Sequence, residues 1–456
     1  MKLTKNKNFK EEYCASVVKI GEVMPIEGKD RIVKTLVNGQ SIVIGKQDFK
    51  PGDIAVYVSN ECVIHELFLH LNNMYDDKEL NADKTQRGYI KSKGRVRVVK
   101  LGGVPSYGIL LTPASIGRFL NESEDSVKAF LASNVGEDFD EINGERFCHV
   151  YVPYHRPHNE SRADKKSKKI ARFKMLIDGS FRLHYDTKQL EKNIHNFSPT
   201  DVVDISVKIH GTSAVFANIE TNIPTHWYKR LWRKYVTHRP EFDTAYNLIY
   251  SSRTVIKNEF VNPHQKAGGY YGDDVWGYWA KKLEGLIPKD YCFYCEIVGY
   301  TPNGKAIQKD YDYGCSPMSE EKSKLMVYRI THNGKELEIP SVKSFGEELA
   351  MHVSGIMQLP LLWHGTLADL CPNISAEQHW HEGVLEELKH YKSLGMEGNE
   401  PLCKNKVPRE GIVIRKANDP IAEAWKLKCD AFRMREAKQI DAGEVDAEMA
   451  ETYGEA

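Results

Sequence analysis

The sequence lacks a net charge, a long apolar run and a cysteine framework. Lysine and arginine together number 63, as do aspartate and glutamate, so the formal net charge of zero favours no class of partner. No apolar run approaches the ~20 residues that span a bilayer, and the first residues, MKLTKNKNFKEEY, contain no apolar signal core. The 9 cysteines are an odd number scattered over 456 residues, which fits a reducing cytosol better than disulfides. We therefore expect a soluble cytoplasmic protein without a membrane partner.

The length suggests two or three domains, at roughly 150 residues per domain. From about residue 13 to residue 113, β-branched runs are separated by turn signals such as PIEGKD, KPGD and LGGVPS. The predicted strands are YCASVVKI, RIVKTLVNGQSIVIG, DIAVYVS, RVRVVKL and YGILLTP. Asn-Gly in the second run predicts a hairpin turn, because these residues tolerate positive φ. About five strands in ~100 residues are typical of a small barrel such as an OB fold.

The stretch that follows is a predicted connector. Its first part, SEDSVKAFLASNVG, has a helical pattern, and its second part, PYHRPHNESRADKKSKKIARFK, is rich in lysine and arginine. The basic part is either a solvated linker or a strip that docks on an anionic partner. The last residues, EAKQIDAGEVDAEMAETYGEA, are acidic, and we expect a frayed helix without chemistry there.

The remaining sequence mixes strand and helix patterns. Predicted strands are DVVDISVKIHG, TSAVFANI, NLIYSSRTV, DYCFYCEIVG, KLMVYRIT, REGIVIRK and AWKLKC. Predicted helices, with apolar spacings near 3.6 residues, are DDVWGYWAKKLEGL, SVKSFGEELAMHVSG and EGVLEELKHYKSL. We therefore predict an α+β protein, with an OB-like β-barrel module at 1–115, the helical and basic connector at 116–180, an α/β domain at 181–436 and an acidic tail at 437–456.

One lysine in the α/β domain has an unusual setting. Lys208 ends the apolar strand pattern VDISVK and is followed at once by His210 and Gly211. A free lysine amine, with pKa near 10.4, becomes a nucleophile only when burial or neighbouring positive charge lowers that pKa. Both conditions are available, because Lys426 and Lys428 occur in a second strand pattern, WKLKC. With a spacing of two they point to one face of their strand, where their repulsion favours a bound anion such as phosphate.

Two carboxylates also occur in strand patterns. Glu296 lies in FYCEIVGY and Glu410 in REGIVIRK, and a carboxylate in an apolar strand is costly unless it is paired or holds a metal. A hard divalent ion such as Mg²⁺ takes one or two carboxylates together with phosphate oxygens of a substrate. Arg253, in IYSSRTV, adds a guanidinium suited to phosphate. These residue types together predict a site for a phosphorylated ligand and a divalent metal.

In their sequence order, these segments resemble the motifs of the covalent nucleotidyltransferases, the superfamily of ATP-dependent ligases and capping guanylyltransferases. KIHGTS is similar to the lysine motif, SSRT to the arginine motif and FYCEIVG to the glutamate motif, followed by the aromatic strand LMVYRI. EGIVIRK and WKLK are similar to the two closing motifs. Each motif alone is weak, but six in this order are specific. The resemblance covers residues of about 15–115 and 180–435.

The resemblance implies a fold and a reaction. The implied fold is an adenylation domain of two antiparallel sheets, unrelated to ATP-grasp, with the nucleotide between the sheets. Lys208 is implied to attack the α-phosphorus of ATP and form a lysine–AMP intermediate. Lys426 and Lys428 are implied to hold the α-phosphate and offset its growing charge. Glu410 is implied to bind Mg²⁺ or Mn²⁺, through water.

The same resemblance assigns further residues to the nucleotide. Glu296 and Arg253 are implied to bind its ribose and phosphate side, with Glu296 as a weaker metal ligand. Tyr328 is implied to stack on adenine, and His210 to orient phosphates or an end of RNA. Gly211 is also implied to lie at the nucleotide, because a turn directly after the lysine needs backbone freedom and a close approach to the nucleotide.

The histidine of the lysine motif separates the possible substrates. DNA ligases and capping enzymes usually carry aspartate where His210 stands, and the K-x-H-G-T form resembles RNA ligases that seal nicks in duplex RNA. The strand-rich region before it looks like the OB module of one RNA ligase branch. The implied protein is a monomer that joins a 3′-hydroxyl to a 5′-phosphate of RNA through lysine–AMP and RNA–adenylate intermediates. The alternatives are a DNA ligase, a GTP-dependent guanylyltransferase and a non-catalytic RNA-binding protein.

An insert between the lysine and arginine motifs, HWYKRLWRKYVTHR, mixes aromatic and basic residues. Its rings suit stacking on bases while its cations meet phosphates. The alternative is an amphipathic helix that packs its aromatic side chains on the domain. The candidate RNA contacts are Lys229, Arg230, Trp232, Arg233 and Lys234, with Trp227 and Tyr235 as further rings.

A second basic pattern lies in the OB-like region. Lys91, Lys93, Arg95 and Arg97 alternate with other residues along a predicted barrel strand. Such an alternation fits an RNA-binding surface and equally fits a solvated strand face.

Overall fold

The computed structural model describes residues 1–152, 175–263, 269–374, 380–417, 419 and 423–444, and these form two compact units. The first unit comprises Met1–Pro153, Glu191–Ile194 and Arg433–Ala442, and the second comprises Tyr154–Leu190, His195–Phe432 and Gly443–Ala456. The basic half of the predicted connector, 153–174, lies outside the described residues, as does the acidic end, 445–456. Within the described residues, no helix is long and apolar enough to cross a membrane.

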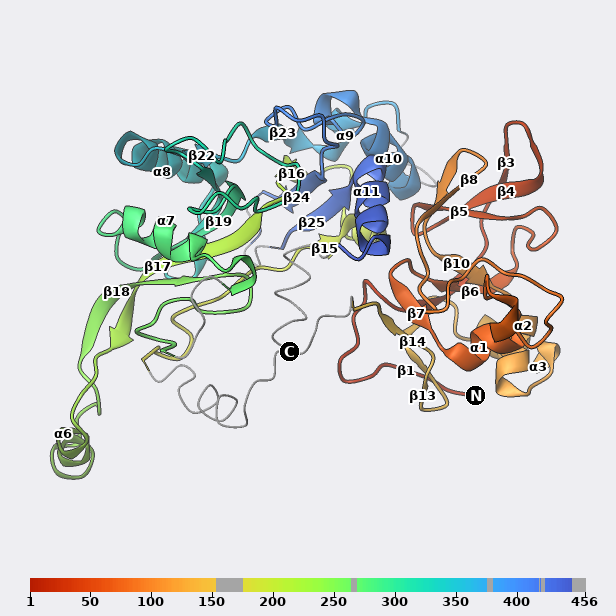
Figure 1. The fold of residues 1–456 in the computed structure, drawn as a ribbon, viewed down its shortest axis with the longest axis horizontal. Helices are drawn as coiled ribbons and strands as arrows, with labels where there is room; N and C mark the ends of the chain where they lie inside the picture. The colour runs from red at the N-terminus through yellow and green to blue at the C-terminus, as the bar shows by residue number, and fades with distance from the viewer. Residues whose placement is uncertain (153–174, 264–268, 375–379, 418, 420–422, 445–456) are drawn as a thin grey trace. The chain divides into compact units, whose positions relative to one another are not determined.

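The first unit is built on small antiparallel sheets (Figure 1). A four-stranded sheet has the order β10-β6-β2-β11, with β2 (Ala15–Lys19), β6 (Ile54–Val58), β10 (Ile109–Leu111) and β11 (Asp138–Phe139). A three-stranded meander contains β3 (Val23–Ile26), β4 (Lys29–Val37) and β5 (Gln40–Gly45). The short remaining strands are β1 (Leu3–Thr4), β7 (Cys62–Ile64), β8 (Val99–Leu101), β9 (Val104–Ser106), β12 (Glu141–Ile142), β13 (Glu145–Arg146) and β14 (Cys148–Val150).

Helices close the core of this unit. They are α1 (Glu66–Leu71), α2 (Pro113–Leu120), α3 (Glu124–Ala132) and the end of α11 (Asp430–Asp441). The helix predicted in the connector is therefore α3, and it belongs to the first unit. Ala437 of α11 is buried in one core cluster with Val33 and Tyr57, so the start of the predicted acidic tail is packed helix. The predicted Asn-Gly turn is present between β4 and β5, with φ of 49° at Asn38 and 67° at Gly39.

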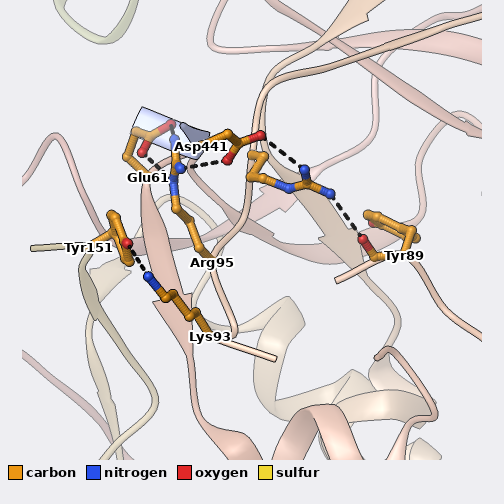
Figure 2. A network of polar contacts seen from close by, with 7 residues as sticks. Glu61, Tyr89, Lys93, Arg95, Tyr151 and Asp441 are labelled. Carbon is orange, nitrogen blue, oxygen red and sulfur yellow. Dashed lines mark hydrogen bonds and ion pairs between the residues drawn. The ribbon is translucent and has the colours of Figure 1, made fainter. Parts of the chain in front are cut away.

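Two residues of the basic alternation at 91–97, Arg95 and Arg97, form an ion-pair network with two carboxylates (Figure 2). The Arg95 guanidinium donates to both oxygens of Glu61, at 2.6 and 2.7 Å, and to Asp441 at 2.9 Å. Arg97 donates to the other Asp441 oxygen at 3.0 Å. Arg95 is buried and Arg97 is half-buried, so these two residues do not form a solvated strand face, whereas Lys91 and Lys93 are exposed. Of the predicted strand RVRVVKL only β8 forms, while Arg95 makes a single bridge to Val63. We call Glu61, Arg95, Arg97 and Asp441 the Arg95 network.

The second unit contains two larger sheets. One has the order β15-β25-β24-β16-β23, with β15 (Lys188–Gln189), β16 (Val202–Lys208), β23 (Leu361–Thr366), β24 (Gly411–Lys416) and β25 (Trp425–Lys428). The other has the order β18-β17-β19-β20-β21, with β17 (Thr212–Asn222), β18 (Thr244–Ser251), β19 (Tyr291–Gly299), β20 (Ser323–His332) and β21 (Lys335–Glu336). The pairs are antiparallel except β15 with β25 and β20 with β22 (Ile356–Gln358), which are parallel.

Helices pack on these sheets, and the predicted three are present. They are α7 (Val275–Leu283), α8 (Ile339–His352) and α10 (Trp380–His390). The second unit also contains the short α6 (Trp227–Trp232) and α9 (Leu367–Leu370), whereas the short α5 (Leu190–Asn193) belongs to the first unit from Glu191 on. In α7, Trp276 and Trp279 are fully buried in the core cluster of the six-stranded sheet. Strands β16 and β17 follow each other in the chain but lie in different sheets, so the turn at His210 and Gly211 connects the two sheets. This connection positions the candidate site.

Candidate active site

Lys208 stands in a row of three residues on adjacent strands. It pairs with Gly411 of β24, which in turn pairs with Lys428 of β25. Residues directly opposite in a sheet present their side chains on the same face, so both lysines project from one surface. A Cβ on Gly411 would lie 2.1 Å from the Leu427 carbonyl oxygen, so any larger residue would push β25 away. The absent side chain therefore permits the close spacing of the row.

Glu410 is the buried acidic centre of this row. Its side chain is 3 % exposed, and its Oε1 lies 2.8 Å from Lys208 Nζ and 3.8 Å from Lys428 Nζ. Its Oε2 lies 3.6 Å from His210 Nδ1 and has no hydrogen-bond partner in the described structure. Glu410 directly precedes β24 rather than lying within it. One carboxylate thus faces two lysines and a histidine, which we call the Lys208 cluster.

His210 is held by aromatic residues that the sequence pattern did not single out. Its ring meets those of Tyr311 and Phe432 edge to face, with centroids 4.8 and 4.9 Å apart. Its backbone N–H donates to the Tyr313 hydroxyl at 2.8 Å. Burial raises the pKa of Tyr313, so this hydroxyl stays protonated at neutral pH. These contacts fix the ring against Glu410.

Gly211 brings the turn against β19. A Cβ there would lie 2.4 Å from the Ile297 carbonyl oxygen, so the close approach predicted for this glycine is to protein backbone. Its N–H donates to Glu296 Oε1 at 3.1 Å, and its carbonyl accepts from Gln308 Nε2 at 2.8 Å. Gly211 is not among the positive-φ residues, so the close packing, rather than a left-handed backbone, requires a glycine. Glu296 positions this turn.

Tyr328 and Arg253 contact a segment that precedes the lysine strand. Nδ1 of His184 lies 3.1 Å from the Ser213 hydroxyl and 3.4 Å from the Tyr328 hydroxyl. Burial raises the pKa of Tyr328, which keeps the phenol protonated. Arg253 lies just after β18 and forms an ion pair with Asp186 at 2.8 Å. The strand patterns gave no signal for His184 or Asp186, since both lie in irregular backbone.

Lys426 belongs to the same surroundings. It lies on β25 opposite Val413, two residues before Lys428, so both lysines share one strand face. Desolvation acts to raise the pKa of Asp186, but the hydrogen bond and charge of Arg253, followed by the charges of His184 and Lys426, lower it. The structure therefore gathers the lysines, carboxylates, histidine and arginine predicted from sequence around the turn that connects the two sheets.

The donors suit a divalent cation held with the help of a substrate. Within the described residues, no group of three or more histidine, cysteine, aspartate or glutamate side chains is arranged to hold a metal by itself. Glu410 does offer a buried carboxylate oxygen without a hydrogen-bond partner among the described residues. A cation bound there would take its other ligands from phosphate oxygens and water, as Mg²⁺ commonly does.

The basic and aromatic insert lies apart from this site. Residues 223–243 connect the paired ends of β17 and β18, Asn222 and Thr244, and contain α6 followed by a π-helix over Arg233–Thr237. Figure 1 shows α6 at the far end of this hairpin. The predicted RNA contacts of the insert are therefore not brought together with the Lys208 cluster.

The architecture is similar to that of known proteins. A family model described as an OB-fold domain matches residues 14–113. RNA ligase from Naegleria gruberi, in a variant solved with AMP and manganese, aligns with a TM-score of 0.55 at 18% identity, over 93% of this chain and 98% of that chain. A variant with ATP and manganese gives 0.53 at 18% identity, over 92% and 98%. The same ligase with pyrophosphate gives 0.53 at 17% identity, over 93% and 99%. Comparison with curated protein sequences gives no match.

These likenesses establish the fold. The chain has an OB-fold domain, and as a whole it matches the mixed α+β fold of an RNA ligase. The predicted fold class is therefore confirmed, with two parallel strand pairs added to the expected antiparallel sheets.

Proposed function

We propose that this protein is an ATP-dependent RNA ligase that uses Lys208 as its nucleophile. The observation that carries the proposal is the row of Lys208, Gly411 and Lys428 around buried Glu410, within a fold similar to an RNA ligase. That similar ligase was solved with ATP, with AMP and with pyrophosphate, which are the substrate, transferred group and product of such a reaction.

The first step forms a bond between nitrogen and phosphorus. The Lys208 amine attacks the α-phosphorus of ATP, the bond from phosphorus to the pyrophosphate oxygen breaks, and pyrophosphate leaves. The amine loses a proton, for which Glu410 Oε1, at 2.8 Å, is a placed acceptor. Lys426 and Lys428 offset the negative charge that develops on the α-phosphate. The product is a lysine–AMP phosphoramide.

The later steps move AMP and then release it. A 5′-phosphate oxygen of RNA attacks the phosphorus of lysine–AMP, the nitrogen–phosphorus bond breaks, and the lysine amine is restored. A 3′-hydroxyl then attacks the activated 5′-phosphate, AMP leaves, and a phosphodiester bond remains. His210 orients the phosphates or the RNA end, since its ring is fixed beside Glu410 by Tyr311 and Phe432.

A divalent cation, Mg²⁺ or Mn²⁺, fits Glu410. The buried oxygen without a hydrogen-bond partner in the described structure supports this assignment, and the metal supplies positive charge beside the phosphates. Glu296 is the weaker metal candidate, because its Oε1 already accepts the Gly211 N–H. Arg253 and Tyr328 are assigned to the phosphate side and to the base of ATP, respectively.

The RNA substrate in this proposal is a nick in an RNA duplex or in an RNA-containing hybrid. The support is the K-x-H-G-T form at Lys208 and His210, where DNA ligases and capping enzymes usually carry aspartate. A DNA ligase, a guanylyltransferase and a non-catalytic RNA-binding protein make different predictions in the following experiment.

The test is covalent labelling. Protein is incubated with Mg²⁺ and α-labelled ATP or, separately, α-labelled GTP, and is then resolved by denaturing electrophoresis. We expect label from ATP, and its loss in Lys208→Ala and in Lys208→Arg, which keeps a cation near Glu410 but removes the amine. Lys416→Ala is the matched control, because Lys416 lies at the other end of β24 and pairs with Asp201. It should label like wild type.

Each other outcome selects a different protein class. Label from GTP alone would indicate a guanylyltransferase. No label from either nucleotide, on folded protein whose mass shows no prior adenylate, would contradict the proposal and leave an RNA-binding protein. Labelled protein given nicked RNA and nicked DNA duplexes with a 5′-phosphate should join the RNA strand, whereas joining of DNA alone would indicate a DNA ligase.

A further inference from the structure

The insert at the tip of the β17–β18 hairpin turns its apolar side outward. Trp227, Trp232 and Tyr235 are 71%, 61% and 67% exposed. Their neighbours Tyr228, Leu231 and Val236 are also exposed, and the spacings of four residues place all six on one side of the helical segment. A surface helix of a globular protein normally packs this side on the core. We call these six residues the aromatic face.

Three basic residues of the insert pair instead with acidic residues that follow the helical segment. Arg230 pairs with Glu241 at 2.8 Å, and its guanidinium lies 4.4 Å from the ring centre of Phe242. Arg233 pairs with Asp243 at 2.9 Å, and Lys234 pairs with Glu241 at 3.2 Å. The helical segment is therefore fixed by its charged side to residues 241–243. This arrangement contradicts the expectation that the aromatic residues pack on the domain, and it leaves three of the four basic candidates engaged within the insert.

The composition of the hairpin tip, residues 226–243, indicates which kind of ligand would bind the aromatic face. Residues 226–243 hold five lysines and arginines against two acidic residues, so the tip is positively charged. Its exposed side consists mainly of the flat rings of Trp and Tyr. Rings of this kind stack on nucleic-acid bases, and a positive setting attracts a polyanion. Stacking needs a base whose face is uncovered, so fully paired RNA does not offer this contact.

We propose that the aromatic face binds unpaired bases of the RNA substrate, at a distance from the joining site. This inference rests on the proposed function and adds a second RNA contact to it. Strand β17 begins at Thr212, directly after Gly211, and its 11 residues end beside the insert. At about 3.3 Å per residue, β17 alone spans roughly 35 Å, so the tip lies at about that distance or more from the turn that follows Lys208. The substrate thus is paired at the join and becomes single-stranded at about the distance of the tip.

The test compares two RNAs that differ only in an unpaired extension. Both are nicked duplexes, and in one of them a single-stranded overhang begins roughly 35 Å from the nick. Affinity is measured for wild type and for Trp227→Ala/Trp232→Ala. We expect the variant to lose at least about tenfold in affinity for the overhang RNA and less than threefold for the fully paired RNA. A Trp227→Phe/Trp232→Phe protein keeps rings and should recover most of the loss.

Controls separate stacking from charge and from folding. Met351→Ala, which removes another highly exposed apolar side chain of the second unit, should bind both RNAs like wild type. The salt dependence of overhang binding should have the same slope in wild type and the tryptophan variant, since no phosphate contact is removed. Lysine–AMP formation with ATP should also be unchanged, because the tip is far from Lys208. If lysine–AMP never forms in wild type but the overhang effect is present, the proposed function fails and this inference stands.

Other results would overturn the inference. Equal loss of both RNAs would mean that the tip supports the fold or reads duplex RNA, and no loss of either would mean that it does not touch RNA. Sedimentation with anionic lipid vesicles that is abolished in the tryptophan variant would assign the aromatic face to a membrane surface. A wild-type dimer that becomes a monomer in the variant would assign it to a second copy of the chain.

Discussion

The Lys208 cluster and the Arg95 network both gather cations around carboxylates, yet the oxygens of those carboxylates are used differently. In the Arg95 network, two guanidiniums face Glu61 and Asp441, and each carboxylate receives two hydrogen bonds. In the Lys208 cluster, Lys208 and Lys428 both face Oε1 of Glu410, at 2.8 and 3.8 Å. The carboxylates of the first set accept hydrogen bonds on both oxygens. The carboxylate of the second keeps Oε2 without a hydrogen-bond partner among the described residues, so that oxygen can serve a bound ligand.

The geometry of the donors points the same way. Planar guanidiniums bind carboxylates through fixed pairs of hydrogen bonds, as Arg95 does with Glu61. Lysine ammonium groups are point charges on flexible stems, and Lys428 lies 3.8 Å from Glu410, beyond hydrogen-bond distance. A network of the first kind stabilises a fold, whereas a cluster of the second kind can exchange its partner for a phosphate.

Removing Arg95 should have the largest effect on stability. Arg95→Ala leaves Glu61 as a buried carboxylate without its main partner, and such a loss costs about 3–5 kcal/mol. We expect the first unit of the variant to unfold at a clearly lower urea concentration than wild type. The matched control is Lys93→Ala, which removes a neighbouring cation that contacts the Tyr151 hydroxyl at 3.3 Å and is exposed. It should cost less than about 1 kcal/mol.

The same pair of variants tests whether the network is only structural. At a temperature at which Arg95→Ala is folded, it should form lysine–AMP like wild type. Loss of the adenylate from folded Arg95→Ala would show that the network contributes to the reaction, and the contrast with the Lys208 cluster would then be wrong.

Removing Lys428 should affect the reaction rather than the fold. Lys428→Ala leaves Glu410 with Lys208, so no buried carboxylate is left without a cation. The α-phosphate loses one stabilising charge, and we expect the rate of lysine–AMP formation to fall by about 10²-fold. Single-turnover labelling with α-labelled ATP measures the rate, and Lys416→Ala is the control. Unfolding free energy that falls by more than about 2 kcal/mol, with an unchanged rate, would make Lys428 a structural residue.

The strand-borne half of the site was predictable from the sequence. Lys208, Glu296 and Lys428 lie on strands that apolar patterns located, and the spacing of Lys426 and Lys428 fixed their common face. The loop-borne half was not predictable. Tyr313 and Gln308 reach the His210 turn from a segment between β19 and β20 that has no period to read. Their places depend on contacts far away in the chain.

The insert shows a second limit. Its helical pattern was visible, and the pattern alone favoured a buried aromatic side. The side that is exposed depends instead on Glu241 and Asp243, which follow the helical segment and form ion pairs with its basic residues. Which side of an amphipathic helix faces the protein is thus decided by a neighbouring segment, and helical periodicity carries no information about that segment.

Replacing Asp312 should have the smallest of the expected effects on stability. This residue lies in a loop that supports the Lys208 cluster without touching it. Its carboxylate accepts backbone N–H groups of Gly314, Lys404 and Asn405, at 2.7, 3.0 and 2.9 Å. It thereby fixes the loop in which Tyr313 meets the His210 backbone. Burial acts to raise the pKa of Asp312, but these donors lower it below the ordinary aspartate value.

The sign of the pH dependence follows from this lowered pKa. A carboxylate whose pKa is lower in the folded state stabilises the fold above its unfolded pKa, and that contribution is lost as pH falls through the folded pKa. Asp312→Asn should therefore cost about 2 kcal/mol of unfolding free energy at pH 7, and its difference from wild type should shrink below about pH 4. Urea unfolding at several pH values measures this, with the exposed Asp310→Asn as control. A difference that grows on acidification would show that Asp312 is not held as a carboxylate by these donors.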